Sequence, residues 1–274
     1  MVSGFEFNDG PWHHVPGYLQ EIDNFYEELN HKLTPAQIAA DKIVQQRGWM
    51  PTFSLIKDTL VPTIQELDIR YIPKQMKLGP GVFFPIYDHE RRPLHARLNP
   101  FYELESLNGL MKYAMVGKDK DHRNHSLFGQ SLQCITNMIK YRSVLFVEGY
   151  YDLLAARLLH PEAAVLSTGQ KSINDKQIWF CRMAGIERVL VLFDRDEKNA
   201  GKKGAGAGRD ATRQLIARMP KDHPGIEFVD CGYAIGADDP SDCLKDRLVA
   251  ERFQQSLKMW FPVKSEIPEE PIGS

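Results

Sequence analysis

Acidic side chains directly follow two of the most apolar stretches of the chain. Glu148 follows segment 143–147, and Asp194 and Asp196 follow segment 188–193. Alternate residues that leave a strand point the same way, so Asp194 and Asp196 can present two carboxylates to one site. Hard cations such as magnesium take oxygen ligands, and three carboxylates from neighbouring strand ends can hold two such ions. The predicted chemistry is a two-metal, in-line displacement at phosphorus.

Each of these positions also has a simpler explanation. A glutamate after a strand, such as Glu148, is usually a loop residue. The pair formed by Asp194 and Asp196 could cap the helix that follows. The occurrence of both features on two strands of one alternating series is more specific than either feature alone.

The elements that must position these carboxylates follow a regular pattern after residue 141. Four short apolar segments predict strands, and helical spacing between and after them predicts helices. The predicted strands are 143–147, 163–166, 188–193 and 226–229, and the predicted helices are 151–159, 175–184, about 209–218 and 241–257. This alternation indicates an α/β domain, with a parallel sheet and helices on both faces. Such sheets bind ligands outside the carboxyl ends of their strands.

The part before residue 141 has a mixed, α+β pattern. Thr34 is a typical N-cap ahead of Pro35, so a helix is expected over 36–46. Strands are expected over 82–87 and 94–98, around a charged turn at 89–93. We therefore predict an amino-terminal subdomain over 1–140, a catalytic domain over 141–258, and a disordered, proline-containing tail over 259–274.

Composition excludes several classes of protein. The chain has 274 residues, of which 43% are hydrophobic and 26% charged, and neither a membrane span nor a secretory signal is predicted. The four cysteines are scattered without a Cys-x-x-Cys pair, so we expect no zinc ribbon, no disulfide framework and a reducing, cytoplasmic location. The net charge of −2 argues against tight non-specific DNA binding but permits an acidic metal cluster beside a basic groove.

Several motifs resemble those of the Toprim domain. Residues 147–152 (Val-Glu-Gly-Tyr-Tyr-Asp) and 193–196 (Phe-Asp-Arg-Asp) resemble its two signature motifs, in the variant found in DnaG-type and phage primases. Residues 168–171, 207–211 and 239–242 resemble the family's glycine-containing turn, its Ala-Gly helix start and its late Asp-Pro motif. The resemblance covers roughly residues 143–250 in the correct order.

The resemblance implies roles for the acidic residues. Glu148 would be a metal ligand or general base, and Asp194 and Asp196 would be metal ligands. The implied cofactor is magnesium or manganese, with two or more ions and no zinc.

Asp152 and Asp239 would be supporting or additional ligands, but both have local alternatives. Asp152 could be a favourable charge in the first turn of a helix, and Asp239 could be an N-cap ahead of Pro240. Asp238 and Asp242 could equally be the acidic partners in that motif.

One departure from the family is the basic segment 197–206 between the second motif and the Ala-Gly helix start. It is either a flexible surface loop or a mobile lid over triphosphate or template. Lys202 and Lys203 in this segment, and Arg209 after it, are candidate nucleotide or template contacts.

The amino-terminal part is similar to the polymerase core of DnaG-type primases. The similarity rests on Phe-Phe-Pro-Ile-Tyr-Asp at 83–88, Arg97, Lys112-Tyr113, Leu-Phe-Gly at 127–129, and a helix over 39–49 that ends in Arg-Gly. The resemblance implies phosphate contacts for Arg97 and Lys112, although a basic residue on a strand is more often simply solvated.

The function implied is DNA replication chemistry: synthesis of RNA primers on a single-stranded DNA template from nucleoside triphosphates. No segment resembles the zinc-binding or helicase-interaction domains of these primases. Either the chain is a core fragment, or a separate zinc protein selects the template, and a replicative helicase is a further expected partner. The alternatives are a Toprim nuclease and a non-catalytic scaffold that binds nucleic acid.

Overall fold

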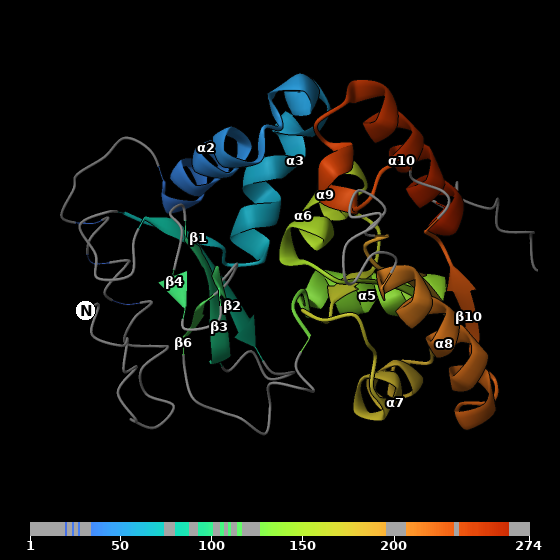
Figure 1. Ribbon diagram of the computed structural model, residues 1–274. Helices are drawn as coiled ribbons and strands as arrows, with labels where there is room; N and C mark the ends of the chain where they lie inside the picture. Colours follow the sequence, from blue (N-terminus) through green and yellow to red (C-terminus); the bar gives the residue numbers. More distant parts are fainter. Residues whose placement is uncertain are drawn as a thin grey trace, which may run out of the picture.

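The computed structural model describes residues 34–73, 80–87, 93–100, 105–106, 109–110, 114–116, 127–195, 207–232 and 236–262, together with Gln20, Asn24 and Glu27. Figure 1 shows an antiparallel sheet built from the amino-terminal part and a second sheet built from the carboxy-terminal part, with helices between and around them. Among these residues, no helix has both the length and the apolar character needed to cross a lipid bilayer.

Of the α-helices described in the amino-terminal part, the first packs on the antiparallel sheet and on the helix that follows it. Helix α2 (Pro35–Arg47) follows Thr34, the predicted N-cap, which forms a capping box with Gln37. The helix ends at Gly48, whose φ of 68° is left-handed. After the short helix η1 (Met50–Thr52), helix α3 (Phe53–Glu66) was not predicted. Pro62 within α3 suggests a break, but burial of one face of the helix outweighs the helix-breaking tendency of proline.

The antiparallel sheet has the strand order β1-β2-β3-β6. Its strands are β1 (Arg70–Ile72), β2 (Gly81–Tyr87), β3 (Pro93–Pro100) and β6 (Ala114–Val116). A separate hairpin joins β4 (Glu105–Ser106) to β5 (Gly109–Leu110). The two strands predicted around the charged turn are β2 and β3, and they are antiparallel as expected. Residues 88–92 of the turn lie outside the described residues.

The second sheet is parallel and has the order β10-β9-β7-β8. Its strands are β7 (Ser143–Val147), β8 (Val165–Ser167), β9 (Arg188–Leu192) and β10 (Glu227–Asp230). All four were predicted, and their parallel arrangement is confirmed. The order, however, places the third predicted strand beside the first, so the two strands that precede the candidate carboxylates are neighbours.

Helices cover both faces of the parallel sheet (Figure 1). The chain passes from β7 through α6 (Tyr150–Leu159) to β8, then through α7 (Asp175–Met183) to β9, and through α8 (Ala207–Asp222) to β10. In the strand order, the connection from β7 to β8 runs across the sheet in one direction, and the connections from β8 to β9 and from β9 to β10 run in the other. Because such crossovers are right-handed, α6 lies on one face, and α7 and α8 lie on the other.

The single helix predicted over 241–257 is wrong. The structure has a short helix α9 (Pro240–Cys243) followed by α10 (Arg247–Trp260). Asp246 interrupts the helix because its carboxylate accepts hydrogen bonds from Leu248 N at 2.8 Å and Val249 N at 3.1 Å, so it is an N-cap. Helix α10 continues to Trp260, beyond the predicted start of the tail, and residues 263–274 lie outside the described part of the chain.

One hydrophobic core joins the two sheets. Every residue of α6 is buried, and the helix packs against α3, α9 and α10. Helix α5 (Leu132–Tyr141) packs on β7, and Phe128 pairs with Ser167 through an isolated antiparallel bridge. Segment 127–141 therefore lies with the parallel sheet, and the division of the chain at residue 141 stays a prediction.

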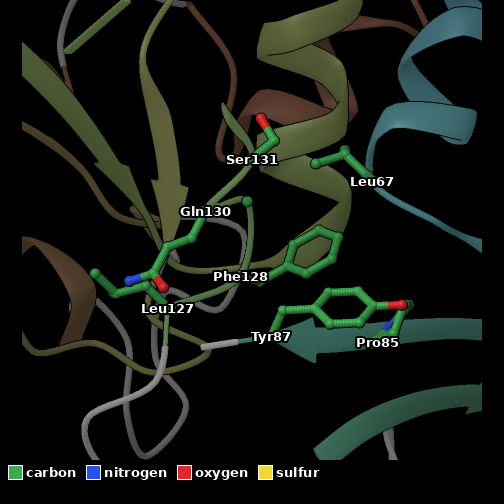
Figure 2. A pocket seen from close by; sticks show the side chains of 8 residues that line it. Leu67, Pro85, Tyr87, Leu127, Phe128, Gln130 and Ser131 are labelled. Atoms are coloured by element: carbon green, nitrogen blue, oxygen red, sulfur yellow. The ribbon is translucent and has the colours of Figure 1, made fainter. Parts of the chain in front are cut away.

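Hollows on the described surface include two that contain no candidate carboxylate. The first, of about 10 Å³, lies between the end of β2 and segment 127–131, with the rings of Tyr87 and Phe128 along its wall (Figure 2). The second, of about 210 Å³, lies between the start of α2, the end of α3 and β1. The first has room for about one water molecule.

The four cysteines are free and buried, in keeping with the expectation of no disulfide framework. Burial raises the pKa of Cys134 to about 11 and that of Cys231 to about 12, and it also raises the pKa values of Cys181 and Cys243.

We expect these thiols to react slowly with iodoacetamide at pH 8 in the folded protein and rapidly in urea. Because the folded thiols release protons at higher pH than unfolded thiols, stability is retained below pH 9 and falls as the pH rises through about 11. Urea unfolding between pH 7 and pH 10.5 measures this fall. Rapid labelling of four thiols in the folded protein would contradict the burial.

Candidate active site at the ends of the parallel strands

The two predicted acidic turns lie side by side. Strands β7 and β9 are hydrogen-bonded neighbours, and Val147 is paired with Leu192 at their carboxyl ends. Glu148 follows Val147 directly, and Asp194 follows Leu192 by two positions. Neighbouring strands are about 4.8 Å apart, so both carboxylates leave the same edge of the sheet. Asp196, predicted beside them, lies outside the described residues.

Glu148 and Asp194 are each partly exposed, and each has one buried carboxylate oxygen. The backbone of Glu148 is fixed by the end of β8, because its carbonyl oxygen accepts hydrogen bonds from Ser167 Oγ at 2.9 Å and from Gly169 N at 3.0 Å. The turn at 168–171 predicted from sequence therefore supports the acidic turn at its side.

Gly169 is required at this turn for two reasons. Its φ of +67° is left-handed, and a Cβ added there would lie 2.6 Å from the hydroxyl oxygen of Tyr150. Tyr150 is the first residue of α6 and is buried, so it has little freedom to move away.

We expect Gly169→Ala to destabilise the protein more than Gly185→Ala. Both residues have left-handed φ, which costs about 1–2 kcal/mol for alanine, but nothing lies within 4 Å of the Cβ position at Gly185. Displacement of Tyr150 should add about 1–3 kcal/mol in the first variant alone. Urea unfolding of both variants measures the difference, and equal losses would show that Tyr150 moves freely.

The turn that carries Asp238 and Asp239 lies beside the same edge of the parallel sheet. Arg195, between the two predicted ligands of the second motif, donates its backbone N–H to Asp238 O at 2.9 Å. Asp239 is the N-cap of α9, since its Oδ1 accepts hydrogen bonds from Asp242 N at 2.7 Å and Ser241 Oγ at 2.8 Å. The capping alternative for Asp239 is thus realised, and ligation by its carboxylate stays a prediction.

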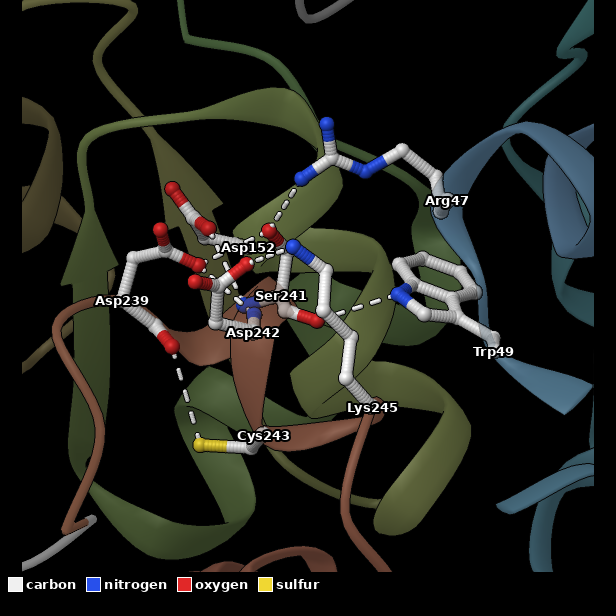
Figure 3. Close-up of polar contacts among 8 residues, drawn as sticks. All are labelled: Arg47, Trp49, Asp152, Asp239, Ser241, Asp242, Cys243 and Lys245. Carbon is white, nitrogen blue, oxygen red and sulfur yellow. Dashed lines mark hydrogen bonds and ion pairs between the residues drawn. The ribbon is translucent and has the colours of Figure 1, made fainter. Parts of the chain in front are cut away.

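Asp152 is 5% exposed and lies in the first turn of α6. Its Oδ2 accepts a hydrogen bond from Gly149 N at 2.8 Å, and its Oδ1 accepts one from Ser241 N at 3.2 Å. Figure 3 shows Asp152 beside Asp239 and Ser241. Asp152 therefore joins the first acidic turn to the start of α9, whether or not it also binds metal.

Arg97 reaches this edge from the antiparallel sheet. It lies on β3, and its guanidinium donates a hydrogen bond to the Tyr150 hydroxyl group. Burial raises the pKa of Tyr150, and the positive charge of Arg97 acts in the opposite direction. The structure therefore places Arg97 next to Tyr150, the residue that follows Glu148-Gly149.

Of the other predicted basic contacts, only Arg209 is among the described residues. It lies in the first turn of α8, is partly exposed, and has a buried Nε with no hydrogen-bond partner in the described part of the chain. Lys112, Lys202 and Lys203 lie outside that part.

An aromatic cluster connects the two sheets beneath the site. Phe84 on β2 stacks on Tyr150 with a centroid distance of 5.5 Å, and it meets Tyr151 edge-on at 5.1 Å. Phe128 meets Tyr150 edge-on at 5.2 Å. Such pairs contribute about 0.5–1.5 kcal/mol each beyond their buried area, so the start of α6 is held from the amino-terminal side.

Sequence reasoning missed three residues that contact the acidic turns. Arg47 Nη2 donates to Ser241 Oγ at 2.6 Å, and Trp49 Nε1 donates to Ser241 O at 3.0 Å (Figure 3). Arg47, Trp49 and Ser241 occur within quoted motifs, but no spacing signal relates residues so far apart in sequence.

The donor set suits a hard divalent cation. Glu148 and Asp194 supply carboxylate oxygens from adjacent strand ends, which is the ligand type that magnesium prefers. Among the residues whose positions are described, no group of three or more His, Cys, Asp or Glu side chains could hold a metal ion. The third predicted ligand, Asp196, falls outside that set.

No protein-family model and no curated protein matches the chain. Solved structures do match. The DnaG catalytic core has a TM-score of 0.60 and 16% identity, with coverage of 91% of this chain and 81% of that chain. The RNA polymerase domain of Mycobacterium tuberculosis primase DnaG has a TM-score of 0.55 and 14% identity, with coverage of 82% and 79%.

A DnaG primase catalytic domain bound to single-stranded DNA has a TM-score of 0.56 and 17% identity, with coverage of 89% and 82%. The chain therefore has the fold of DnaG primase catalytic cores. The resemblance predicted from the motifs is confirmed at the level of the fold.

Proposed function

We propose that the chain is a DnaG-type primase core that synthesises RNA primers on single-stranded DNA. The observation that carries this proposal is the juxtaposition, in a fold shared with DnaG catalytic cores, of Glu148 and Asp194 at the ends of neighbouring parallel strands. Arg97, brought to the same edge by its hydrogen bond to Tyr150, supports it. The arrangement combines carboxylates for metal with a cation for phosphate.

In this proposal, residues 141–258 form a Toprim catalytic domain, and residues 1–140 form a basic subdomain that guides template and nucleotide. Glu148, Asp194 and Asp196 would hold magnesium or manganese, with Asp152 and Asp239 as supporting residues. Two ions held there would supply charge stabilisation for the displacement at phosphorus.

The chain's own residues orient the reactants and handle the proton. The 3′-oxygen of the growing RNA forms a bond to the α-phosphorus of a nucleoside triphosphate, and the bond from that phosphorus to the bridging oxygen breaks to release pyrophosphate. In its alternative role as general base, Glu148 accepts the proton of the 3′-hydroxyl group. Arg97, Lys112, Lys202, Lys203 and Arg209 contact the phosphates of nucleotide or template, so binding should weaken with salt.

Template selection is a separate step in the proposal. A zinc-containing protein or a further part of a longer chain would choose the start site, and a replicative helicase would deliver the single strand. The catalytic test should therefore not depend on initiation.

The test is extension of a short RNA annealed to a single-stranded DNA template, alongside unprimed templates, with labelled ribonucleotides and magnesium or manganese. We expect template-dependent extension that a chelator abolishes. Metal-dependent cleavage of the template without extension would instead establish a nuclease. DNA binding without either reaction would establish a scaffold, and each of these results would overturn the proposal.

A further inference from the structure

We propose that Arg47 and Ser241 form a strut through which helix α2 positions the acidic turns and sets their affinity for divalent metal. This inference rests on the proposed function, because it assigns positioning residues to the metal site of that function. Neither residue touches substrate. Their effect passes through Asp239 and Asp152.

The end of α2 is shaped to present two donors to Ser241. The left-handed Gly48 reverses the chain, and Trp49 N donates back to Val44 O at 3.0 Å. As a result Arg47 and Trp49, on either side of the glycine, both reach the start of α9 (Figure 3). The Arg-Gly ending of this helix thus has a use beyond stopping the helix.

Ser241 uses its backbone and side chain to connect four groups. Its hydroxyl accepts from Arg47 and donates to Asp239 Oδ1, its N–H donates to Asp152 Oδ1, and its carbonyl oxygen accepts from Trp49. The residue is 2% exposed, so water cannot readily replace these bonds.

Two of the bonds of Ser241, to Asp152 and Asp239, lead toward predicted metal ligands. Asp152 also accepts from Gly149 N, next to Glu148, so a shift of Ser241 is transmitted to the first acidic turn. Asp239 follows Asp238, whose carbonyl oxygen holds Arg195, next to Asp194. Groups that orient metal ligands in this way commonly change metal affinity by about 10–100-fold when they are removed.

Arginine suits position 47 for a second reason. The Arg47 guanidinium lies over the Tyr151 ring at 4.6 Å from its centroid, and Tyr151 Oη donates to Asn99 Oδ1 at 3.2 Å. The planar guanidinium can stack and donate at once, which an ammonium group does less well. Arg47 is therefore held in place before any metal binds.

The experiment measures manganese binding to the full chain by electron paramagnetic resonance, for wild type, Arg47→Met, Arg47→Lys, Ser241→Ala and the double variant Arg47→Met/Ser241→Ala. We expect Arg47→Met and Ser241→Ala each to raise the Kd about tenfold. The manganese Kd of the double variant should be no higher than that of the more affected single variant, because both changes break the same Arg47–Ser241 bond. Arg47→Lys should recover part of the loss.

Primer extension provides a second readout. In Arg47→Met and Ser241→Ala, the metal concentration for half-maximal rate should rise in proportion to the Kd, and saturating metal should restore most of the rate. A purely structural role would lower the rate without this shift.

Two matched variants control for loss of charge and loss of a buried hydroxyl group. Arg218→Met removes an exposed arginine of α8, and Ser256→Ala removes a buried hydroxyl that donates to Arg252 O at 3.2 Å within α10. Both should leave the manganese Kd unchanged.

The outcomes separate the two proposals. Wild-type binding that depends on Asp194, with the same Kd in Ser241→Ala and Arg47→Met, overturns the strut and leaves the proposed function standing. An equal loss of manganese affinity in Ser256→Ala and Ser241→Ala also overturns the strut. A wild-type chain without Asp194-dependent manganese binding overturns the metal site of the proposed function, and the strut with it.

Discussion

Asp194→Asn is expected to reduce template-dependent RNA synthesis at least about a thousandfold, because bound metal supplies several kcal/mol of transition-state stabilisation and each 1.36 kcal/mol is a factor of ten in rate. Asparagine keeps the size of the side chain but loses the negative charge that attracts the cation. Since Asp194 is only partly buried, the fold should survive the change. Extension of an annealed RNA, with thermal unfolding of the same samples, measures both effects.

The matched control is Asp222→Asn, at the end of α8, whose carboxylate is half exposed and 3.7 Å from Arg218. This variant loses the same charge far from the strand ends and should keep the wild-type rate. Glu148→Gln should resemble Asp194→Asn, because the two residues leave neighbouring strands. A rate within tenfold of wild type for Asp194→Asn would remove this carboxylate from the reaction.

The parallel sheet could be predicted because its strands are short apolar runs bounded by turn residues. The observed β7 has the predicted bounds, and both acidic turns follow strand ends as expected. The strand order was not predictable in the same way, because it depends on which strands pair across long stretches of sequence. The neighbouring positions of β7 and β9 give the two turns their common location, and only the tertiary structure shows them.

Local rules failed where tertiary contacts outweighed them. Proline in a helix interior costs about 3 kcal/mol, yet α3 continues through Pro62 because Ile56, Leu60 and Ile64 are buried on one face. In the opposite sense, the helical spacing over 241–257 concealed the N-cap at Asp246. Periodicity identifies the buried face of a segment but does not show where one helix stops and the next begins.

The acidic residues of the candidate site could be predicted from sequence, but the residues that hold them in position could not. Types and spacing identified Glu148 and Asp194, because carboxylates after strands have a recognisable pattern. The Arg47–Ser241 bond joins residues 194 positions apart, and nothing in either local sequence predicts it. For Asp152, the first-turn alternative weighed from sequence is visible as a hydrogen bond to Gly149 N. Capping is a local interaction and was therefore open to prediction.

Glu66→Gln is expected to lower the free energy of unfolding by about 3–5 kcal/mol, because it leaves a buried cation without a counter-charge. Arg157 on α6 has a side chain only 1% exposed, and its Nη2 lies 2.6 Å from Glu66 Oε2 on α3. Its Nε and Nη1 have no hydrogen-bond partner among the described residues, so compensation of the charge depends on Glu66. Urea unfolding measures the loss.

Removal of the arginine should lower the free energy of unfolding less than removal of the glutamate charge does, because the two partners are unequally buried. In Arg157→Met, Glu66 keeps a side chain that is 25% exposed and still accepts a hydrogen bond from Ser131, so its charge remains partly solvated. The double variant Glu66→Gln/Arg157→Met should be more stable than Glu66→Gln alone, since removal of both charges ends the burial of an unpaired ion. If Glu66→Gln lowered the free energy of unfolding least among the three variants, the packing of α6 against α3 would depend on shape and not on this ion pair.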